Sequence, residues 1–240
     1  MKFDHKTFFD GYKKAFNTKL TQGQVDGLES LLTSIENDPD VQDVRWAAYM
    51  MATVKHECAD KWQPIEEYGK GKGRKYGSPV TVTGSDGKQY TNVYYGRGYV
   101  QLTWDYNYKK MSPAIGLGDS MYCNPSLALD PSDAYKIMSY GMRKGSFTGK
   151  KLADYINASA CDYKNARRII NGTDQWQLIQ GYAQKLESVL RASLVTDAPP
   201  PPAGQQPSDA PAQSDTTAQL SDAQAGAVGG QTDATGTTTG

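Results

Sequence analysis

Three glutamates that lie close together in the chain could supply acid–base chemistry. Glu57 ends an apolar helical pattern, and Glu66 and Glu67 follow after a Trp-Gln-Pro-Ile segment that leaves the helix. Hydrolysis of a glycosidic bond needs two carboxyl groups: one donates a proton to the leaving oxygen, and the other activates water or attacks the sugar. A carboxyl group at a helix end and another on the following loop can face each other across a cleft. The same pattern is also typical of solvated glutamates at a helix end, so by itself it leaves both interpretations open.

The segment 94–107, YYGRGYVQLTWDYN, gives the glutamates a possible polar neighbour. Two glycines flank Arg97, and glycine permits close backbone approach and unusual φ angles. Gln101, Thr103 and Asn107 are uncharged hydrogen-bonding groups that can line one wall of a cleft if the segment begins extended and then becomes helical. Together with aromatic faces such as Tyr95, they are the groups that a sugar-binding groove needs. The alternative is a loop into an amphipathic helix whose tyrosine and tryptophan side chains belong to the core.

Three motifs resemble the pattern of glycoside hydrolase family 19, which contains plant-type chitinases and many phage endolysins. They are KHE at 55–57, YYGRGYVQLTW at 94–104 and ARRIINGT at 166–173. The intervening QPIEEYGKGKGRKYG is similar to the phage and bacterial lysozyme-like branch of that family. The resemblance runs from about Val44 to Leu190, with the motifs in the family's order.

The resemblance implies a lysozyme-like, α-rich fold and an inverting mechanism that needs no metal or organic cofactor. Inversion implies carboxyl groups roughly 6.5–9.5 Å apart, which leaves space for a water. Glu57 matches the family's general acid. Glu67 matches the base, because it is the final glutamate of the pattern P-I-x-E-Y. Glu66 remains the alternative base, since the loop is shorter than in plant chitinases and the alignment can slip by one.

The resemblance also suggests which side chains bind substrate. Gln101, Thr103 and Asn107 match positions that bind sugar or help to hold the water, and Thr103 keeps the hydroxyl of a serine common in plant members. Asn171 matches a cleft asparagine, and Tyr95 is expected to contact substrate. Arg168 is expected to support the carboxylates electrostatically.

Periodicity predicts a mainly α-helical domain with one small β-hairpin. Apolar spacing at Phe8, Tyr12 and Phe16 indicates a short helix. Thr21 and Gln24 form a capping-box signature. The Asp86-Gly87 pair lies between alternating residues and predicts the hairpin. Further helices are expected at about Val41–Cys58, from Asp130-Pro131 to near Gly145, at 152–156, at 163–171, and from a cap at Thr173 or Asp174 through Leu190.

The composition divides the chain into a domain, 1–195, and a tail, 196–240. The tail contains no Lys, Arg, Glu or aromatic residue and almost no large apolar side chains. Such a segment cannot bury enough surface to offset the entropy of ordering, so we expect it to be disordered. The five aspartates of the tail leave 26 basic against 21 acidic residues in 1–195, a net charge of +5. A mildly basic domain suits a polyanionic partner, although ordinary surface charge is the alternative.

Cellular location is an expectation from the same composition. The N-terminal segment lacks an apolar signal-peptide core, and no apolar run is long enough for a membrane span. We therefore expect synthesis in a (host) cytoplasm, no stable membrane insertion, and action at the cell wall or periplasm. A holin-like membrane protein is implied only for a lysis enzyme. The odd cysteine count, Cys58, Cys123 and Cys161, favours reduced thiols that are at least partly buried.

The hypothesis is a monomeric wall hydrolase that cuts β-1,4 bonds between the amino sugars of peptidoglycan. Chitin is the rival substrate, and nucleic acid is not expected as a partner. The basic loop GKGKGRK at 69–75 would border the cleft and hold the anionic peptides of peptidoglycan. A non-catalytic wall-binding or virion structural protein on the same fold is the second hypothesis.

Overall fold

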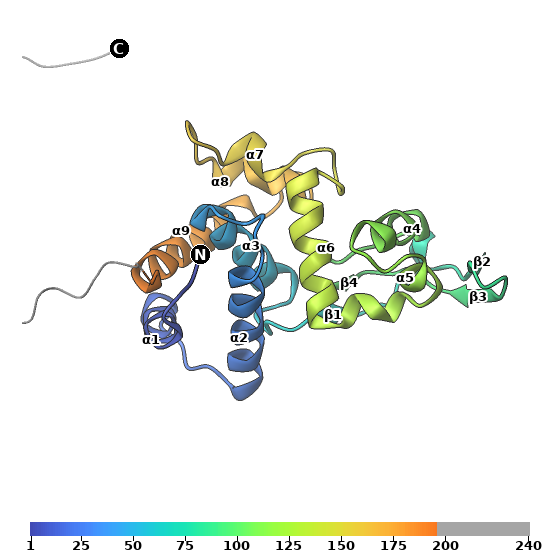
Figure 1. Ribbon diagram of the computed structural model, residues 1–240, viewed down its shortest axis with the longest axis horizontal. Helices are drawn as coiled ribbons and strands as arrows, with labels where there is room; N and C mark the ends of the chain where they lie inside the picture. Colours follow the sequence, from blue (N-terminus) through green and yellow to red (C-terminus); the bar gives the residue numbers. More distant parts are fainter. Residues whose placement is uncertain (196–240) are drawn as a thin grey trace, which may run out of the picture. The chain divides into compact units, whose positions relative to one another are not determined.

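The computed structural model describes residues 1–195, which form a mainly α-helical fold (Figure 1). The predicted disordered tail, 196–240, lies outside the described residues. The longer helices are α1 (His5–Phe16), α2 (Gln22–Glu36), α3 (Val44–Glu57), α4 (Asp105–Ala114), α6 (Pro131–Lys144) and α9 (Trp176–Ser193). Single-turn helices are α5 (Ser120–Cys123), α7 (Leu152–Tyr155) and α8 (Tyr163–Ala166), and 3-10 turns are η1 (Lys75–Gly77), η2 (Pro125–Leu129) and η3 (Arg167–Ile169). The prediction of a mainly α, lysozyme-like fold is confirmed.

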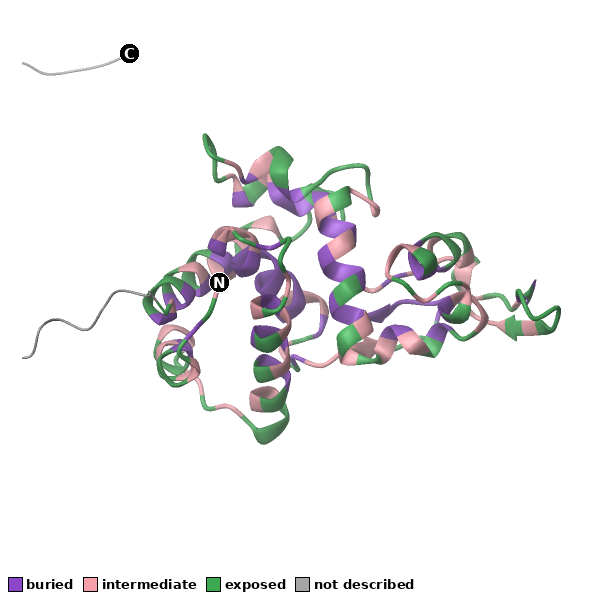
Figure 2. Cartoon of the chain, viewed as in Figure 1, coloured by how far each residue is buried: buried purple, intermediate pink, exposed green. Residues whose placement is uncertain are grey.

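Helix α3 is the centre of the core. Every residue from Ala47 to Lys55 is buried (Figure 2). A helix that is apolar around most of its circumference must be covered on several sides. Helix α9 packs along α3 and also against α1. The core therefore holds α3 firmly along its length, and Glu57 is the last residue of this buried helix.

The ends of the helices follow local hydrogen-bonding signals. The Thr21–Gln24 capping box at the start of α2 is present as predicted, and α6 ends at Gly145 in the left-handed conformation that glycine adopts easily. Helix α3 starts later than predicted, because the Asp43 side chain caps it by accepting from the Arg45 N–H. The predicted cap of the last helix at Thr173 or Asp174 is wrong: α9 begins after Gln175, which has a φ of 55°.

Two small antiparallel ribbons interrupt the helices. Strands β2 (Val80–Thr83) and β3 (Gln89–Asn92) form the predicted hairpin around Asp86-Gly87, and it projects from the helices as a largely exposed arm (Figures 1 and 2). Strands β1 (Ile65–Glu66) and β4 (Arg97–Gly98) form a second ribbon that the periodicity did not signal. Its register pairs Ile65 with Gly98 and Glu66 with Arg97. This ribbon joins two segments that the sequence analysis had selected separately.

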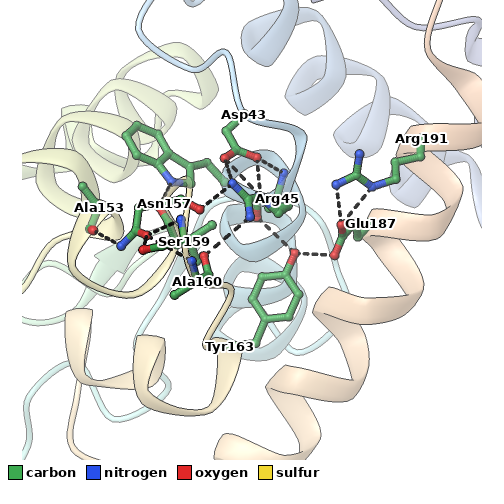
Figure 3. Close-up of polar contacts among 11 residues, drawn as sticks. Asp43, Arg45, Ala153, Asn157, Ser159, Ala160, Tyr163, Glu187 and Arg191 are labelled. Atoms are coloured by element: carbon green, nitrogen blue, oxygen red, sulfur yellow. Dashed lines mark hydrogen bonds and ion pairs between the residues drawn. The ribbon is translucent and has the colours of Figure 1, made fainter.

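A polar network fixes the N-terminal end of α3 (Figure 3). Arg45 pairs with Asp43 at 2.6 Å and donates to the carbonyl of Asn157 at 2.9 Å. The Tyr163 hydroxyl donates to Glu187 on α9 at 2.8 Å. Hydrogen bonds to charged groups are stronger than neutral ones. The network therefore anchors the end of α3 that is opposite to Glu57.

The three cysteines differ in burial. Cys58 is buried and Cys123 is half-buried, as expected, whereas Cys161 is exposed and contradicts the expectation for all three. Cys161 forms an isolated β-bridge with Ile156, and its side chain is exposed there. Within residues 1–195, no helix combines the length and the apolar character that crossing a bilayer requires.

Candidate active site

The end of α3 meets the β1–β4 ribbon directly after Glu57. The Cys58 thiol lies 3.8 Å from the carbonyl oxygens of both Gly98 and Tyr99. Gly98 has a φ of +83°, and a Cβ added there would lie 2.7 Å from the Ala128 carbonyl, so only glycine fits this junction. Because Gly98 pairs with Ile65 across the ribbon, the segment that carries Glu66 and Glu67 is held beside the end of α3.

Glu57 forms an ion pair with Arg167. Arg167 Nη1 donates to Glu57 Oε1 at 2.7 Å, and the two side chains are 3% and 17% exposed. Arg167 Nε also donates to the carbonyl oxygen of Asp174 at 3.0 Å. Among the hydrogen bonds of residues 1–195, Glu57 Oε2 accepts none, so one oxygen is fixed and the other is free to act on a ligand.

Arg167, and not the predicted Arg168, is the arginine that pairs with Glu57. Arg168 is exposed, and within residues 1–195 its guanidinium donates one hydrogen bond, to the Asn165 side chain at 3.4 Å. The turn from α8 into η3 buries Tyr163, Ala166 and Arg167 and leaves Arg168 exposed. Helical periodicity from Tyr163 could have identified Arg167, because a residue four positions later lies on the same face.

Glu66 is surrounded by donors and cations. The Tyr95 hydroxyl donates to Oε1, and Lys70 Nζ pairs with Oε2 at 2.9 Å. Arg97 Nε lies 4.0 Å from Oε1. The hydrogen bonds from Tyr95 and Lys70 lower the pKa of Glu66, and the charges of Lys70 and Arg97 act in the same direction. Glu66 is therefore an ionised carboxylate that cations already compensate.

Buried Arg97 supports the segment that carries Tyr95. Its guanidinium lies 3.6 Å from the centre of the Tyr95 ring, a cation–π contact. Nη1 donates to the carbonyl oxygens of Val93 and Tyr95 at 3.0 and 3.2 Å. The flanking Gly96 has a separate reason: a Cβ added there would lie 2.9 Å from Gln101 Oε1.

Glu67 is held by neutral donors instead. The Tyr76 hydroxyl donates to Oε1 at 2.9 Å, and the Gly96 N–H donates to Oε2 at 3.1 Å. The backbone of Glu67 adds a bond from its N–H to the Gly96 carbonyl at 2.8 Å. Burial and the Glu67 carboxylate raise the pKa of Tyr76, so its hydroxyl stays a donor. Tyr76 packs edge-on against Trp104 at 5.5 Å, which links Glu67 to the 94–107 segment.

The other predicted substrate contacts lie near the ribbon or at the surface. Gln101 Nε2 donates to the carbonyls of Ile65 and Gly98, both at 3.1 Å, so this amide ties β1 to β4. Asn107 Nδ2 donates to the Thr103 carbonyl at 2.8 Å. Exposed Asn171 accepts from the N–H of Gly172 at 2.9 Å. As substrate contacts, these residues and Tyr95 stay predictions.

The arrangement offers acid–base groups without a metal-binding set. In the described part of the chain, no three His, Cys, Asp or Glu side chains are placed to hold a metal ion together. The structure brings together one carboxyl group at the end of α3, one on the neighbouring ribbon and one directly after it, with polar and aromatic groups around the last two. All three carboxyl groups were predicted from the sequence, whereas Arg167 and Tyr76, which hold Glu57 and Glu67, were not.

Comparison with solved structures identifies the fold. Chitinase C from Streptomyces griseus HUT6037 matches with a TM-score of 0.53 and 23% sequence identity, over 79% of this chain and 93% of that one. The chain shares the fold of chitinase C. A bacterial family 19 chitinase also matches, with a TM-score of 0.46 and 21% identity, over 78% of this chain and 94% of that one. No protein-family model and no curated protein sequence matches the chain.

Proposed function

We propose that the chain is a glycoside hydrolase that cuts β-1,4 bonds between amino sugars in bacterial peptidoglycan by an inverting, two-carboxylate mechanism. The observation that carries this proposal is the junction of the α3 end with the β1–β4 ribbon, which sets Glu57 beside the segment of Glu66 and Glu67. The shared fold with chitinase C supports the reaction class, and the three family 19-like motifs agree with it.

Glu57 is the proposed general acid. Arg167 holds Oε1, so the side chain keeps one orientation, and Oε2, which accepts no hydrogen bond within residues 1–195, carries the proton to the leaving oxygen. A general acid must reach the glycosidic oxygen in a fixed geometry, and the bond from buried Arg167, which is itself held by the Asp174 carbonyl, provides this. Arg167 is a positioning residue in this scheme.

Glu67 is the proposed base. A base must accept a proton from water, and its partners, the Tyr76 hydroxyl and the Gly96 N–H, are neutral. Glu66 is the weaker candidate, because Lys70 and the Tyr95 hydroxyl lower its pKa and Arg97 lies close by. We infer a structural role for Glu66, which holds Tyr95, Lys70 and Arg97 in place. The expected carboxyl separation for inversion, roughly 6.5–9.5 Å, applies to the Glu57–Glu67 pair.

Charge favours peptidoglycan over chitin. Residues 1–195 carry a net charge of +5. Lys72, Arg74 and Lys75 are exposed on the loop after Glu67, and within residues 1–195 none of the three has a carboxylate within 4 Å. Chitin is uncharged, whereas peptidoglycan carries the carboxylates of its peptides, which this loop can attract. We place the reaction at the cell wall, with release through a holin-like protein if the enzyme serves lysis.

Two polymers and two glutamate variants test the proposal. Purified protein is incubated with isolated peptidoglycan and with chitin oligomers, and new reducing ends are read by mass spectrometry. We expect cleavage of peptidoglycan, with Glu67→Gln reducing turnover far more than Glu66→Gln. Cleavage of chitin alone would show that the protein is a chitinase and would overturn peptidoglycan as the substrate. Binding to either polymer without cleavage would support the non-catalytic wall-binding or virion alternative.

A further inference from the structure

Lys55 carries a buried ammonium group in an aromatic enclosure. Its side chain is 7% exposed, and Nζ lies 4.6–5.6 Å from the ring centres of Tyr12, Phe16, Trp62 and Tyr182. The Tyr12 hydroxyl accepts a hydrogen bond from Nζ at 2.9 Å. These rings come from α1, α9 and the loop after α3. Burying a lysine ammonium costs free energy unless it is paired, so an apolar side chain would be the simpler choice here unless the charge has a role.

The partner of Lys55 is Asp60, which lies in a strained turn. Lys55 Nζ pairs with Asp60 Oδ1 at 2.5 Å, and the carbonyl of Lys55 accepts the Asp60 N–H at 2.9 Å. Ala59, Asp60 and Trp62 have φ values of 49°, 62° and 61°. Left-handed φ angles are unfavourable for residues other than glycine, above all for bulky ones, and persist only where the surroundings impose them.

The strained turn connects the two halves of the candidate site. It begins after Glu57 and Cys58 and leads through Gln63 and Pro64 into β1. Helix α2 supports it from outside, because Gln24 Nε2 donates to the Asp60 carbonyl and Gln63 Nε2 donates to the Gly23 carbonyl, both at 2.9 Å. The path of residues 59–62 therefore sets where β1 starts relative to the end of α3.

We propose that Lys55 is a positioning residue for the candidate site: its caged ammonium, paired with Asp60, holds the 59–62 turn that sets Glu67 against Glu57. The inference rests on the proposed function for its catalytic consequence. Its structural basis is the double attachment of Asp60 to Lys55, through the backbone and through the side chain. A methionine would fill the aromatic enclosure and keep the backbone bond, but it would remove the side-chain attachment to Asp60.

The test compares Lys55→Met and Asp60→Asn with a matched control. Asparagine tolerates left-handed φ, so Asp60→Asn removes the charge and keeps the local conformational preference. The control is Arg143→Met, which breaks an ion pair of similar burial: Arg143 and Asp40 are 13% and 62% exposed, against 7% and 48% for Lys55 and Asp60. Asp40 precedes α3, and a 14-residue helix separates it from Glu57 by roughly 20 Å.

The measurements are kcat and KM on peptidoglycan fragments, normalised to folded protein, and hydrogen exchange of the amides of residues 59–67. We expect kcat to fall roughly tenfold or more in Lys55→Met and severalfold in Asp60→Asn, with KM nearly unchanged, because misplacement of about 1 Å affects the transition state most. Exchange should accelerate at 59–67 in both variants but not in Arg143→Met. Unchanged kcat, unchanged exchange, or an equal loss of kcat in the control would overturn the inference.

Two outcomes separate the inference from the function on which it rests. If Lys55→Met does not fold, Asp60→Asn carries the test alone, since its side chain is half exposed. Absence of hydrolysis by the wild-type protein would overturn the proposed function. Hydrolysis by the wild-type protein with undiminished turnover in Asp60→Asn would overturn only the positioning role.

Discussion

Arg167 offers the sharpest structural test of the site, because its loss leaves a carboxylate without its partner. The Arg167→Met change removes the 2.7 Å ion pair to Glu57 and the bond to the Asp174 carbonyl. Removing one partner of a buried pair costs about 3–5 kcal/mol. Since Glu57 is 17% exposed and water can reach it, we take the lower end, about 3 kcal/mol. In a domain of this size that loss lowers Tm by roughly 6–12 °C.

The assay is urea unfolding of Arg167→Met beside Arg168→Met, its adjacent and exposed control. A surface substitution of this kind changes the free energy of unfolding by about 0.5 kcal/mol at most. Turnover should also fall in Arg167→Met, because the Glu57 carboxyl loses its fixed orientation, and should stay near wild type in Arg168→Met. Equal stabilities and equal turnover for the two variants would contradict the role of Arg167 in holding Glu57.

Three further perturbations test other parts of the structure. The lowered pKa of Glu66 means that its carboxylate stabilises the fold above its unfolded pKa and that this contribution is lost as pH falls through the folded pKa. The difference in unfolding free energy between wild type and Glu66→Gln should therefore be largest at neutral pH and shrink in acid. A difference that does not change with pH would contradict the ion pairs of Glu66. Tyr76→Phe removes one donor to Glu67, worth about 1 kcal/mol, so turnover should fall roughly fivefold with little change in Tm, and an unchanged rate would argue against Glu67 as the base. Gly27→Ala places a Cβ 2.2 Å from the Trp62 carbonyl oxygen and should destabilise the fold strongly. Gly181→Ala in α9 meets nothing within 4 Å and should stabilise the fold by about 0.5–1 kcal/mol. Thermal melts of both variants test this, and an unchanged Tm for Gly27→Ala would show that the Trp62 backbone can move.

Much of the helical framework follows from local sequence signals. The Thr21–Gln24 capping box, the Asp86-Gly87 hairpin and the Gly145 helix end each depend on residues close in the chain. The start of α9 did not follow, because Gln175 adopts a left-handed φ that asparagine or glycine would normally mark. Strands of two residues carry no periodicity, so β1 and β4 could not be recognised before the structure.

The candidate carboxyl groups could be selected from the sequence, but their partners could not. Glu57 and the Glu66–Glu67 pair follow from residue type and motif. The pairing of Arg167 with Glu57 was not foreseen, because two adjacent arginines differ only in which of them the turn buries. Tyr76 lies in a glycine- and lysine-rich stretch without regular periodicity, and only the folded loop brings its hydroxyl to Glu67.

The most direct test of the central claim is the release of reducing ends from isolated peptidoglycan by the wild-type protein and by Glu57→Gln, measured side by side at equal concentrations of folded protein. Glutamine keeps the size of the side chain but cannot donate the proton. We expect amino-sugar reducing ends with the wild type and loss of nearly all of them with Glu57→Gln, which should remain folded. Near wild-type release by Glu57→Gln would contradict the assignment of Glu57 as the acid and, with it, the two-carboxylate mechanism proposed for this site.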